Sequence, residues 1–304
     1  MIQALQSALT LILEQTEKSG LTLIDEIEIP YGIKLLFARS GDEIPLNLYY
    51  SDKKGISSVI GGKQQNPLKL VLNEILNKVM NDHRAEHNWE VWVGTDESGK
   101  GDLFGPLVVC GFVMFREDRE KLFRMGIKDS KLLSDKRITE LVPEIQRKFR
   151  GRYEILSLTP LKYNQLYGQF RAQGKKLNEL LAWMHGRIIL NLADKFPVEG
   201  SVIDRFASES TIRSSLRDLK MKELIVIERA EQSDLAVATA SLLARNFFLG
   251  KMLDLNRKFG LDFVRGSGEP AKMLLQTFIS RIGKDRLPEV AKTHFKPVST
   301  LLEK

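Results

Sequence analysis

The chain has 304 residues, of which 43% are hydrophobic and 28% are charged, as in folded globular proteins and unlike disordered ones. Its one cysteine, Cys110, excludes an internal disulfide framework and a thiolate zinc site. No apolar run reaches membrane-spanning length, and the first residues lack the positive segment of a signal peptide. We therefore expect a cytoplasmic protein.

The net charge of +7 is unevenly distributed. Residues 1–87 hold nine Lys and Arg against eleven Asp and Glu, whereas the rest of the chain holds 37 bases against 28 acids. A basic region attracts phosphates, so the C-terminal part suits a protein that handles nucleic acid. Judged from charge alone, a basic protein with no nucleic-acid role is an equally good interpretation.

The first 80 residues predict a helix, four strands and a second helix. Apolar residues recur with helical spacing over 3–18, and short alternating stretches follow, separated by turn residues. The expected strands are 21–30, 32–38, 44–50 and 56–60, and the second helix is 67–80. Residues 81–89 are polar at first and predict a linker, which divides the chain into domains 1–80 and 90–304.

From residue 90 onward, close strands come first and then alternate with helices. This order indicates an α/β fold with a mixed sheet, in which ligands gather at the carboxyl ends of the strands. The expected strands are 91–95, 104–115, 152–158, 201–204 and 223–228. The expected helices are 135–149, 160–169, 175–195, a short one after Ser210, one long helix over 231–258, and 270–282.

The most informative segment follows the first of these strands, where Gly94-Thr95-Asp96-Glu97-Ser98-Gly99-Lys100-Gly101 is found. Its glycine and lysine spacing resembles a nucleotide-binding P-loop, but Gly101 replaces the required Ser or Thr and a strand follows instead of a helix. We therefore reject that interpretation. Adjacent acids repel each other unless a cation lies near them, and glycines allow backbone N–H groups to approach an anion.

Two further acids end strands or begin the next helix. Asp204 closes the apolar run 202–203, and Glu231 follows the strand 223–228. Each taken alone is more often a helix-terminal or solvated charge, but their occurrence together with Asp96 and Glu97 favours a metal site. Asp234, three residues after Glu231, is the alternative for the fourth position.

These segments resemble the type 2 ribonuclease H family, and the Gly99-Lys100-Gly101 form resembles its ribonuclease HIII group. Further similar segments occur in the same order: 129–131 (Asp-Ser-Lys), 180–185, 203–207, and 229–231 with 237–245. The resemblance covers about residues 90–297, and residues 1–80 resemble the N-terminal domain of ribonuclease HIII. It implies a ribonuclease H-like mixed sheet flanked by helices, preceded by a substrate-binding domain similar in fold to the TATA-box-binding protein.

The resemblance also implies an activity, namely hydrolysis of the RNA strand of RNA–DNA hybrids with two Mg²⁺ or Mn²⁺ ions. The products would carry 5′-phosphate and 3′-hydroxyl ends. Asp96, Glu97, Asp204 and Glu231 are then the catalytic, metal-holding acids, with Asp96 between the ions. The remaining expected contacts are with substrate: Ser98, Gly99, Lys100 and Gly101 at the 2′-hydroxyl, and Lys100, Lys128 and Lys131 at phosphates.

Other residues and activities stay open at this stage. His294 could assist product release or a proton transfer, although a structural role is favoured. In residues 1–80 the candidates for hybrid binding are Lys34, Arg39, Lys53, Lys54 and Lys63, with Tyr49 or Tyr50. A ribonuclease HII-like enzyme that cuts at single embedded ribonucleotides and a non-cleaving hybrid-binding protein are the alternatives. No obligate protein partner and no membrane partner are inferred.

Overall fold

A computed structural model describes residues 3–51, 55–63, 66–82, 87–127, 133–216 and 223–302. The chain forms two compact units, Met1–Glu86 and His87–Lys304, which are described separately. Within the described ranges, no helix combines the length and the apolar character that crossing a membrane requires.

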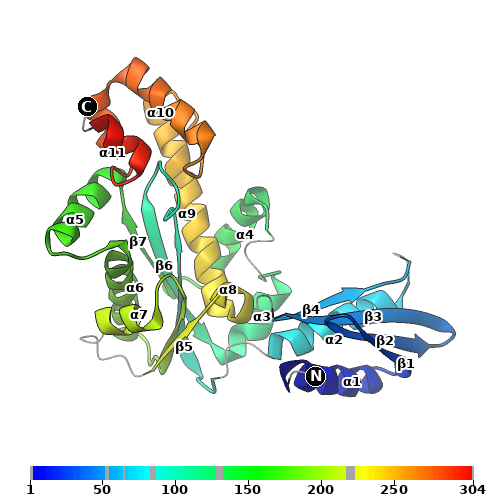
Figure 1. Cartoon of the computed structure of the whole chain (residues 1–304). Coiled ribbons are helices and arrows are strands. Elements are labelled where there is room, and N and C mark those ends of the chain that lie inside the picture. Colours follow the sequence, from blue (N-terminus) through cyan, green and yellow to red (C-terminus); the bar gives the residue numbers. More distant parts are fainter. Residues whose placement is uncertain are drawn as a thin grey trace. The chain divides into compact units, whose positions relative to one another are not determined.

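The N-terminal unit is a four-stranded antiparallel sheet with two helices on one face (Figure 1). Its elements are α1 (Gln3–Lys18), β1 (Thr22–Ile29), β2 (Gly32–Arg39), β3 (Asp42–Ser51), β4 (Gly55–Ile60) and α2 (Leu68–Asp82). Alternation along β2 buries Ile33, Leu35 and Phe37 against the helices, whereas Lys34 and Leu36 turn to the other face. Ser40 and Gly41, with φ of 53° and 90°, make the tight turn that joins β2 to β3.

The second unit is built on a five-stranded sheet of order β7-β6-β5-β8-β9. The strands are β5 (Val91–Ser98), β6 (Leu107–Phe115), β7 (Tyr153–Leu158), β8 (Gly200–Asp204) and β9 (Leu224–Ile227). β5 is central, antiparallel to β6 and parallel to β8. Because helices cover both faces, β5 and β6 are apolar and buried along most of their length.

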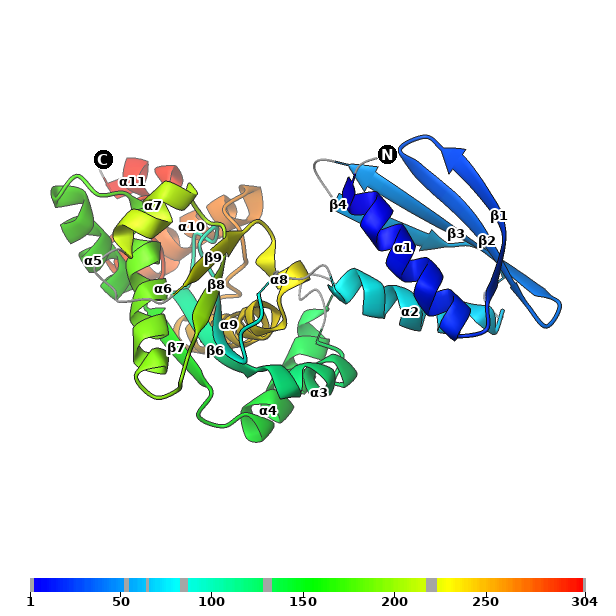
Figure 2. The same cartoon turned by 90° about the horizontal axis from the view of Figure 1, so that it is seen from below.

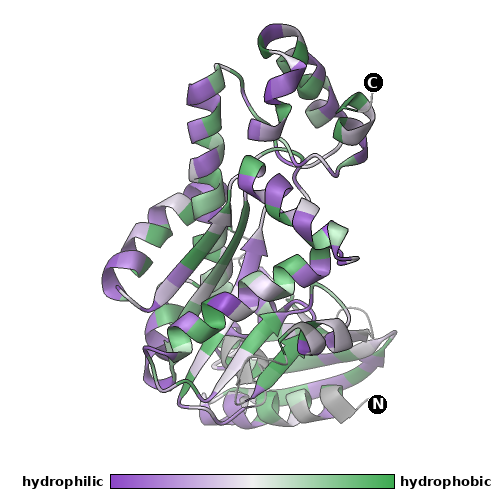
Figure 3. Cartoon of the chain, turned by 90° about the vertical axis from the view of Figure 1, so that its left-hand side faces the viewer, coloured by the Kyte–Doolittle hydropathy of each residue, from purple (hydrophilic) through white to green (hydrophobic). Residues whose placement is uncertain are grey.

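Helices α6 (Leu177–Ala193) and α9 (Leu235–Phe259) lie on opposite faces of this sheet (Figures 1 and 2). Two glycines permit the close approach. A Cβ on Gly94 would lie 2.2 Å from the backbone nitrogen of Val237 in α9, and one on Gly111 would lie 2.3 Å from Cγ2 of Ile188 in α6. Figure 3 shows the strands as largely hydrophobic ribbons and the surrounding helices as alternately hydrophobic and hydrophilic.

Shorter helices complete the second unit: η1 (Arg116–Asp118), α3 (Arg119–Arg124), α4 (Asp135–Lys148), α5 (Pro160–Ala172), α7 (Glu209–Ser215), α8 (Ala230–Ser233), α10 (Glu269–Ile282), η3 (Lys284–Glu289) and α11 (Lys296–Leu302).

Several sequence-based expectations differ from the structure, among them the strand expected over 91–95, which continues to Ser98. The helix expected over 231–258 is two helices, α8 and α9, interrupted at Asp234. The strand expected from 104 begins at Leu107, because Phe104 pairs with Ala291 as an isolated bridge. Helix α3 was not expected. The second helix of the first unit continues to Asp82, and the end of the expected linker, from His87, belongs to the second unit.

Candidate active site

Two acids meet at the carboxyl edge of the central parallel strands. Thr95 of β5 pairs with Ile203 of β8, so Asp96 and Asp204 are the next residues along adjacent strands. Side chains alternate along a strand, and Gly94 faces α9, so Asp96 emerges on the α9 face. Asp204 accepts a hydrogen bond of 3.0 Å from the backbone N–H of Ala230, which brings the helix that carries Glu231 beside it.

Asp96 is almost fully buried, with 9% of its surface exposed. Burial raises the pKa of its carboxyl group well above the usual value, and the charges of Glu97 and Asp204 raise it further. The Ser241 hydroxyl of α9 and the backbone N–H of Glu97, 2.8 Å from Oδ1, donate hydrogen bonds that oppose this effect. The site thus holds a carboxylate whose negative charge is poorly compensated.

Glu97 projects from the opposite face of β5, toward α6. Its Oε2 lies 3.3 Å from Nε2 of His185, whose Nδ1 is 2.8 Å from the Thr95 hydroxyl. Its Oε1 lies 3.6 Å from the ammonium group of Lys100. Burial alone would raise the pKa of Glu97, but the contacts with His185 and Lys100 together outweigh burial and lower it. Glu97 is therefore the stably ionised member of the adjacent pair.

The turn after β5 contains two glycines with different roles. Gly99 has φ of 88°, and a Cβ there would lie 2.2 Å from the carbonyl oxygen of Pro106, so the fold requires glycine. Gly101 is exposed, and a Cβ there would meet nothing within 4 Å. Ser98 is still in β5, paired with Val108.

Lys100 turns back toward the site. Its ammonium group donates to the carbonyl oxygen of Phe206 at 3.2 Å and lies 5.5 Å from the centre of that ring. The Phe206 ring also stacks on His185, with 4.8 Å between ring centres. Lys128 and Lys131, expected to contact phosphates, fall outside the described residues, as does the whole Asp-Ser-Lys segment 129–131.

Asp234 does not share the position of Glu231. It follows the end of α8 and caps α9, where Oδ1 accepts from the N–H of Val237 and Oδ2 accepts from Nε1 of Trp92, both at 2.9 Å. These contacts occupy both oxygens of the Asp234 side chain, one with the start of α9 and one with β5.

His294 packs among aromatic rings, and its Nδ1 lies 3.2 Å from the hydroxyl of Tyr163. Burial, followed by the charges of Lys292 and Arg171, lowers its pKa to about 4, so the imidazole is neutral near pH 7. This environment fits the structural role.

Lys292 has no exposed surface, and its ammonium group donates to the carbonyl oxygens of Asp102 and Gly105 at 2.8 and 2.9 Å. Burial lowers its pKa to about 7. Lys292 thus holds the segment that follows the Gly99–Gly101 turn.

Sequence reasoning assigned no role to three of these residues, His185, Ser241 and Lys292. A signal existed for His185, a single histidine in the otherwise apolar run 180–185 of a buried helix. Ser241 and Lys292 gave none, because their partners lie far away in the sequence.

The donors present suit a hard divalent cation, since Asp96, Asp204 and Glu231 offer oxygen ligands and the negative charge of Asp96 is only partly compensated by hydrogen bonds. Across the parts of the chain that the structure describes, however, no group of three or more His, Cys, Asp or Glu side chains is arranged to enclose an ion. Mg²⁺ keeps several waters and takes one or two protein carboxylates with substrate phosphates, so an open arrangement remains compatible with it.

In the N-terminal unit the expected binding residues separate by face. Lys34 and Tyr49 lie on the sheet face opposite the helices, whereas Tyr50 packs with the core. Arg39 donates to the carbonyl oxygen of Ser19 at 3.1 Å, and Lys63 is exposed. Lys53 and Lys54 fall outside the described residues.

Comparisons with known proteins agree with this architecture. The sequence model of the family described as Ribonuclease HII matches residues 93–298. The chain is 34% identical to ribonuclease HIII of Chlamydia felis, over 88% of this chain and 87% of that protein. It is 33% identical to ribonuclease HIII of Chlamydia trachomatis serovar L2, over 97% and 95%. The solved structure of Bst-RNase HIII in complex with Mn²⁺ has the same fold, with a TM-score of 0.66 at 24% identity over 99% and 96% of the two chains.

The mixed sheet and the similarity of most of the chain to these relatives define a nuclease of the ribonuclease H class. The chain belongs to the ribonuclease HIII group of the type 2 ribonuclease H family.

Proposed function

We propose that this enzyme is an endoribonuclease that hydrolyses the RNA strand of RNA–DNA hybrids and leaves 5′-phosphate and 3′-hydroxyl ends. The observation that carries the proposal is the placement of Asp96 beside Asp204 at one edge of the sheet. Their mutual repulsion adds to burial in raising the pKa of Asp96. A bound divalent cation would remove that cost, which is why such acids are kept together in metal-dependent nucleases.

Asp96, Asp204 and Glu231 would hold the cations, with Glu97 as the fourth acid beside them. A pair of Mg²⁺ or Mn²⁺ ions supplies an activated water and stabilises the departing oxygen in phosphodiester hydrolysis. The chain's own part is to keep the acids ionised and in place. Lys100 and His185 keep Glu97 ionised, and Ser241 orients Asp96.

The turn 98–101 is proposed to read the 2′-hydroxyl of the strand that is cut. RNA differs from DNA at that group, which both donates and accepts hydrogen bonds. Backbone N–H and C=O groups at Gly101 are open to a ligand because no Cβ shields them, and the turn directly follows the acids. Lys100, one third exposed, is the described candidate for a phosphate contact.

Residues 1–80 are proposed as a substrate-binding domain with a fold similar to that of the TATA-box-binding protein, which precedes the catalytic domain. This unit is slightly acidic overall, so net charge cannot attract a hybrid to it. Lys34 and Tyr49, on the face opposite the helices, offer a cation and an aromatic ring for contact with a nucleic acid.

The deciding experiment is cleavage of an end-labelled RNA–DNA hybrid with Mg²⁺, with Mn²⁺ and with a chelator. We expect metal-dependent cuts in the RNA strand, and no cleavage but retained hybrid binding by Asp96→Asn. Wild-type protein that binds the hybrid and never cuts it with either metal would contradict the proposal. A duplex with one embedded ribonucleotide, cut in preference to the continuous hybrid, would favour the ribonuclease HII-like alternative.

A further inference from the structure

The helix that carries Glu231 is too short to hold its own position. Helix α8 has four residues, Ala230–Ser233, and a single turn gains too little hydrogen bonding to be stable alone. It begins after Arg229, which adopts the left-handed conformation with φ of 56°. The position of Glu231 therefore depends on contacts between α8 and the rest of the unit, and two sets of these contacts lie at the ends of α8.

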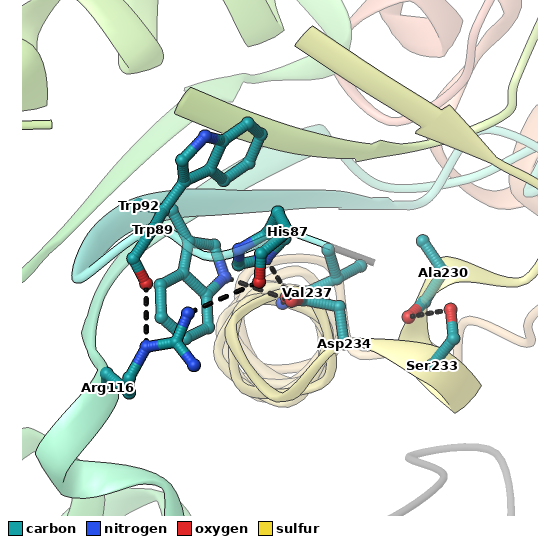
Figure 4. Close-up of polar contacts among 8 residues, drawn as sticks. All are labelled: His87, Trp89, Trp92, Arg116, Ala230, Ser233, Asp234 and Val237. Atoms are coloured by element: carbon teal, nitrogen blue, oxygen red, sulfur yellow. Dashed lines mark hydrogen bonds and ion pairs between the residues drawn. The ribbon is translucent and has the colours of Figure 1, made fainter. Parts of the chain in front are cut away.

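The N-terminal end of α8 is held by Asp204, which accepts from the backbone N–H of Ala230 at 3.0 Å. The C-terminal end is held at Asp234. The backbone N–H of Asp234 donates to the carbonyl oxygen of Ala230 at 2.7 Å. The Ser233 hydroxyl donates to the same oxygen at 3.3 Å (Figure 4).

The side chain of Asp234 connects this point to the central strand. It is 4% exposed, and its two oxygens accept from different elements, Val237 in α9 and the Trp92 indole in β5. Trp92 lies four residues before Asp96, on the same face of β5. One carboxylate thus joins the end of α8, the start of α9 and the strand that carries Asp96.

The Trp92 ring is itself fixed by its neighbours. The His87 ring contacts it edge to face and stacks on Trp89, with 4.7 and 4.1 Å between ring centres, and Nε2 of His87 lies 3.8 Å from Oδ2 of Asp234. Arg116 donates to the carbonyl oxygens of His87 and Trp89, both at 3.2 Å (Figure 4). The indole N–H is therefore presented to Asp234 in one orientation.

We propose that Asp234 is a positioning residue for Glu231, and that its hydrogen bond with Trp92 sets where Glu231 stands relative to Asp96. The inference rests on the proposed function, in which Glu231 helps to hold a cation. A helix cap alone would need only the contact with Val237, so the bond to Trp92 is the part that this role requires.

The test uses the full chain and measures Mn²⁺ affinity by titration calorimetry, with thermal unfolding as a check on folding. Asp234→Ser keeps a capping oxygen but cannot reach Trp92. Trp92→Phe removes the indole donor from the other side and keeps an aromatic ring, although a smaller one. We expect each to weaken Mn²⁺ binding about tenfold, as loss of a group that orients a metal ligand does. The control variant is Ser134→Ala, which removes the N-terminal cap of α4. The Ser134 hydroxyl accepts from the backbone N–H of Arg137 at 3.2 Å, and its loss should leave Mn²⁺ affinity unchanged.

Glu231→Gln distinguishes the positioning role of Asp234 from the proposed metal-binding role of Glu231. If it weakens Mn²⁺ binding while Asp234→Ser and Trp92→Phe bind as the wild type does, the positioning role is overturned and the proposed function stands. If Glu231→Gln also binds Mn²⁺ normally, the proposed metal role of Glu231 fails, and this inference with it. Trp92→Phe keeps an aromatic ring in the core, so it decides the matter even where Asp234→Ser does not fold.

Discussion

Asp96 is an acid whose surroundings in the folded chain oppose its charge, because burial and two neighbouring acids raise its pKa. A carboxyl group whose folded pKa exceeds its unfolded value favours the folded state when protonated. That contribution is lost as pH rises from the unfolded pKa through the folded one, so ionised Asp96 destabilises the metal-free protein at higher pH.

Asp96→Asn should therefore stabilise the metal-free protein while abolishing cleavage. For a unit of this size we expect the unfolding midpoint at pH 8 to rise by about 2–4 °C, the shift that corresponds to about 1 kcal/mol. Added Mn²⁺ should raise the midpoint of the wild type and much less that of the variant. An unchanged or lower unfolding midpoint for metal-free Asp96→Asn would show that the charge on Asp96 does not destabilise the folded protein.

His185→Gln should move the acid limb of the pH–rate profile to higher pH. The pKa of Glu97 is lowered against the effect of burial by His185 and Lys100, so without the imidazole the carboxylate binds a proton at higher pH. The measurement is kcat/KM on a labelled hybrid between pH 5 and 9.

His294→Gln is the matched control for that profile. His294 is neutral over this range because its pKa is about 4, and it contacts Tyr163 rather than an acid. We expect it to change stability and leave the acid limb where it is. Equal shifts in the two variants would mean that His185 acts through the fold and not through Glu97.

At the scale of the element, the two glycines of the turn after β5 have different roles, Gly99 in the stability of the fold and Gly101 in the proposed contact with substrate. Gly99→Ala places a Cβ 2.2 Å from a backbone oxygen at positive φ, so we expect a loss of stability of about 1–3 kcal/mol. Gly101→Ala adds a methyl group in open space and should leave the unfolding midpoint unchanged.

The same methyl group at position 101 should raise KM for the hybrid severalfold, because it shields the backbone groups proposed to approach the 2′-hydroxyl. Urea unfolding and steady-state cleavage of the two variants check both statements. A Gly101→Ala enzyme with wild-type KM would remove Gly101 from the substrate contacts.

Most elements could be predicted from the sequence because they follow from local periodicity and turn residues. Strand alternation placed β1 to β4, and apolar runs ending in acids placed β5, β8 and β9. The interruption at Asp234 could not be predicted this way. Helical spacing continues across it, and the carboxylate that ends α8 is fixed by Trp92, 142 residues away in the sequence.

The same limit applies to the candidate site. The acids could be selected as strand-end residues, and they remain the proposed site. The sequence could not show that Glu97 faces α6 and Asp96 faces α9, because this depends on the register of β5 with its neighbours. Their partners His185, Ser241 and Lys100 could be identified only in the folded chain.

At the scale of the whole molecule, the two units divide the proposed work between binding and cleavage. Lys34→Ala removes a cation from the uncovered sheet face of the N-terminal unit, and we expect KM for the hybrid to rise while kcat changes little. Lys69→Ala, on the helix α2 that packs against the other face, is the matched control. Deleting residues 1–80 should have the larger effect of the same kind, and an equal KM for full-length and truncated protein would contradict the proposed role of this unit.

The side chains of β5 alternate between its two faces, so neighbouring residues of the segment from Gly94 to Ser98 contact different helices. Gly94, Asp96 and Ser98 are one set, spaced two apart and directed to α9, while Thr95 and Glu97 are a second set directed to α6. The two sets alternate in one segment, so one set packs against α9 and the other against α6. Inserting or deleting one residue between Gly94 and Asp96 would exchange the faces of β5 on which Asp96 and Glu97 lie, so the length of this segment is constrained as well as its acids.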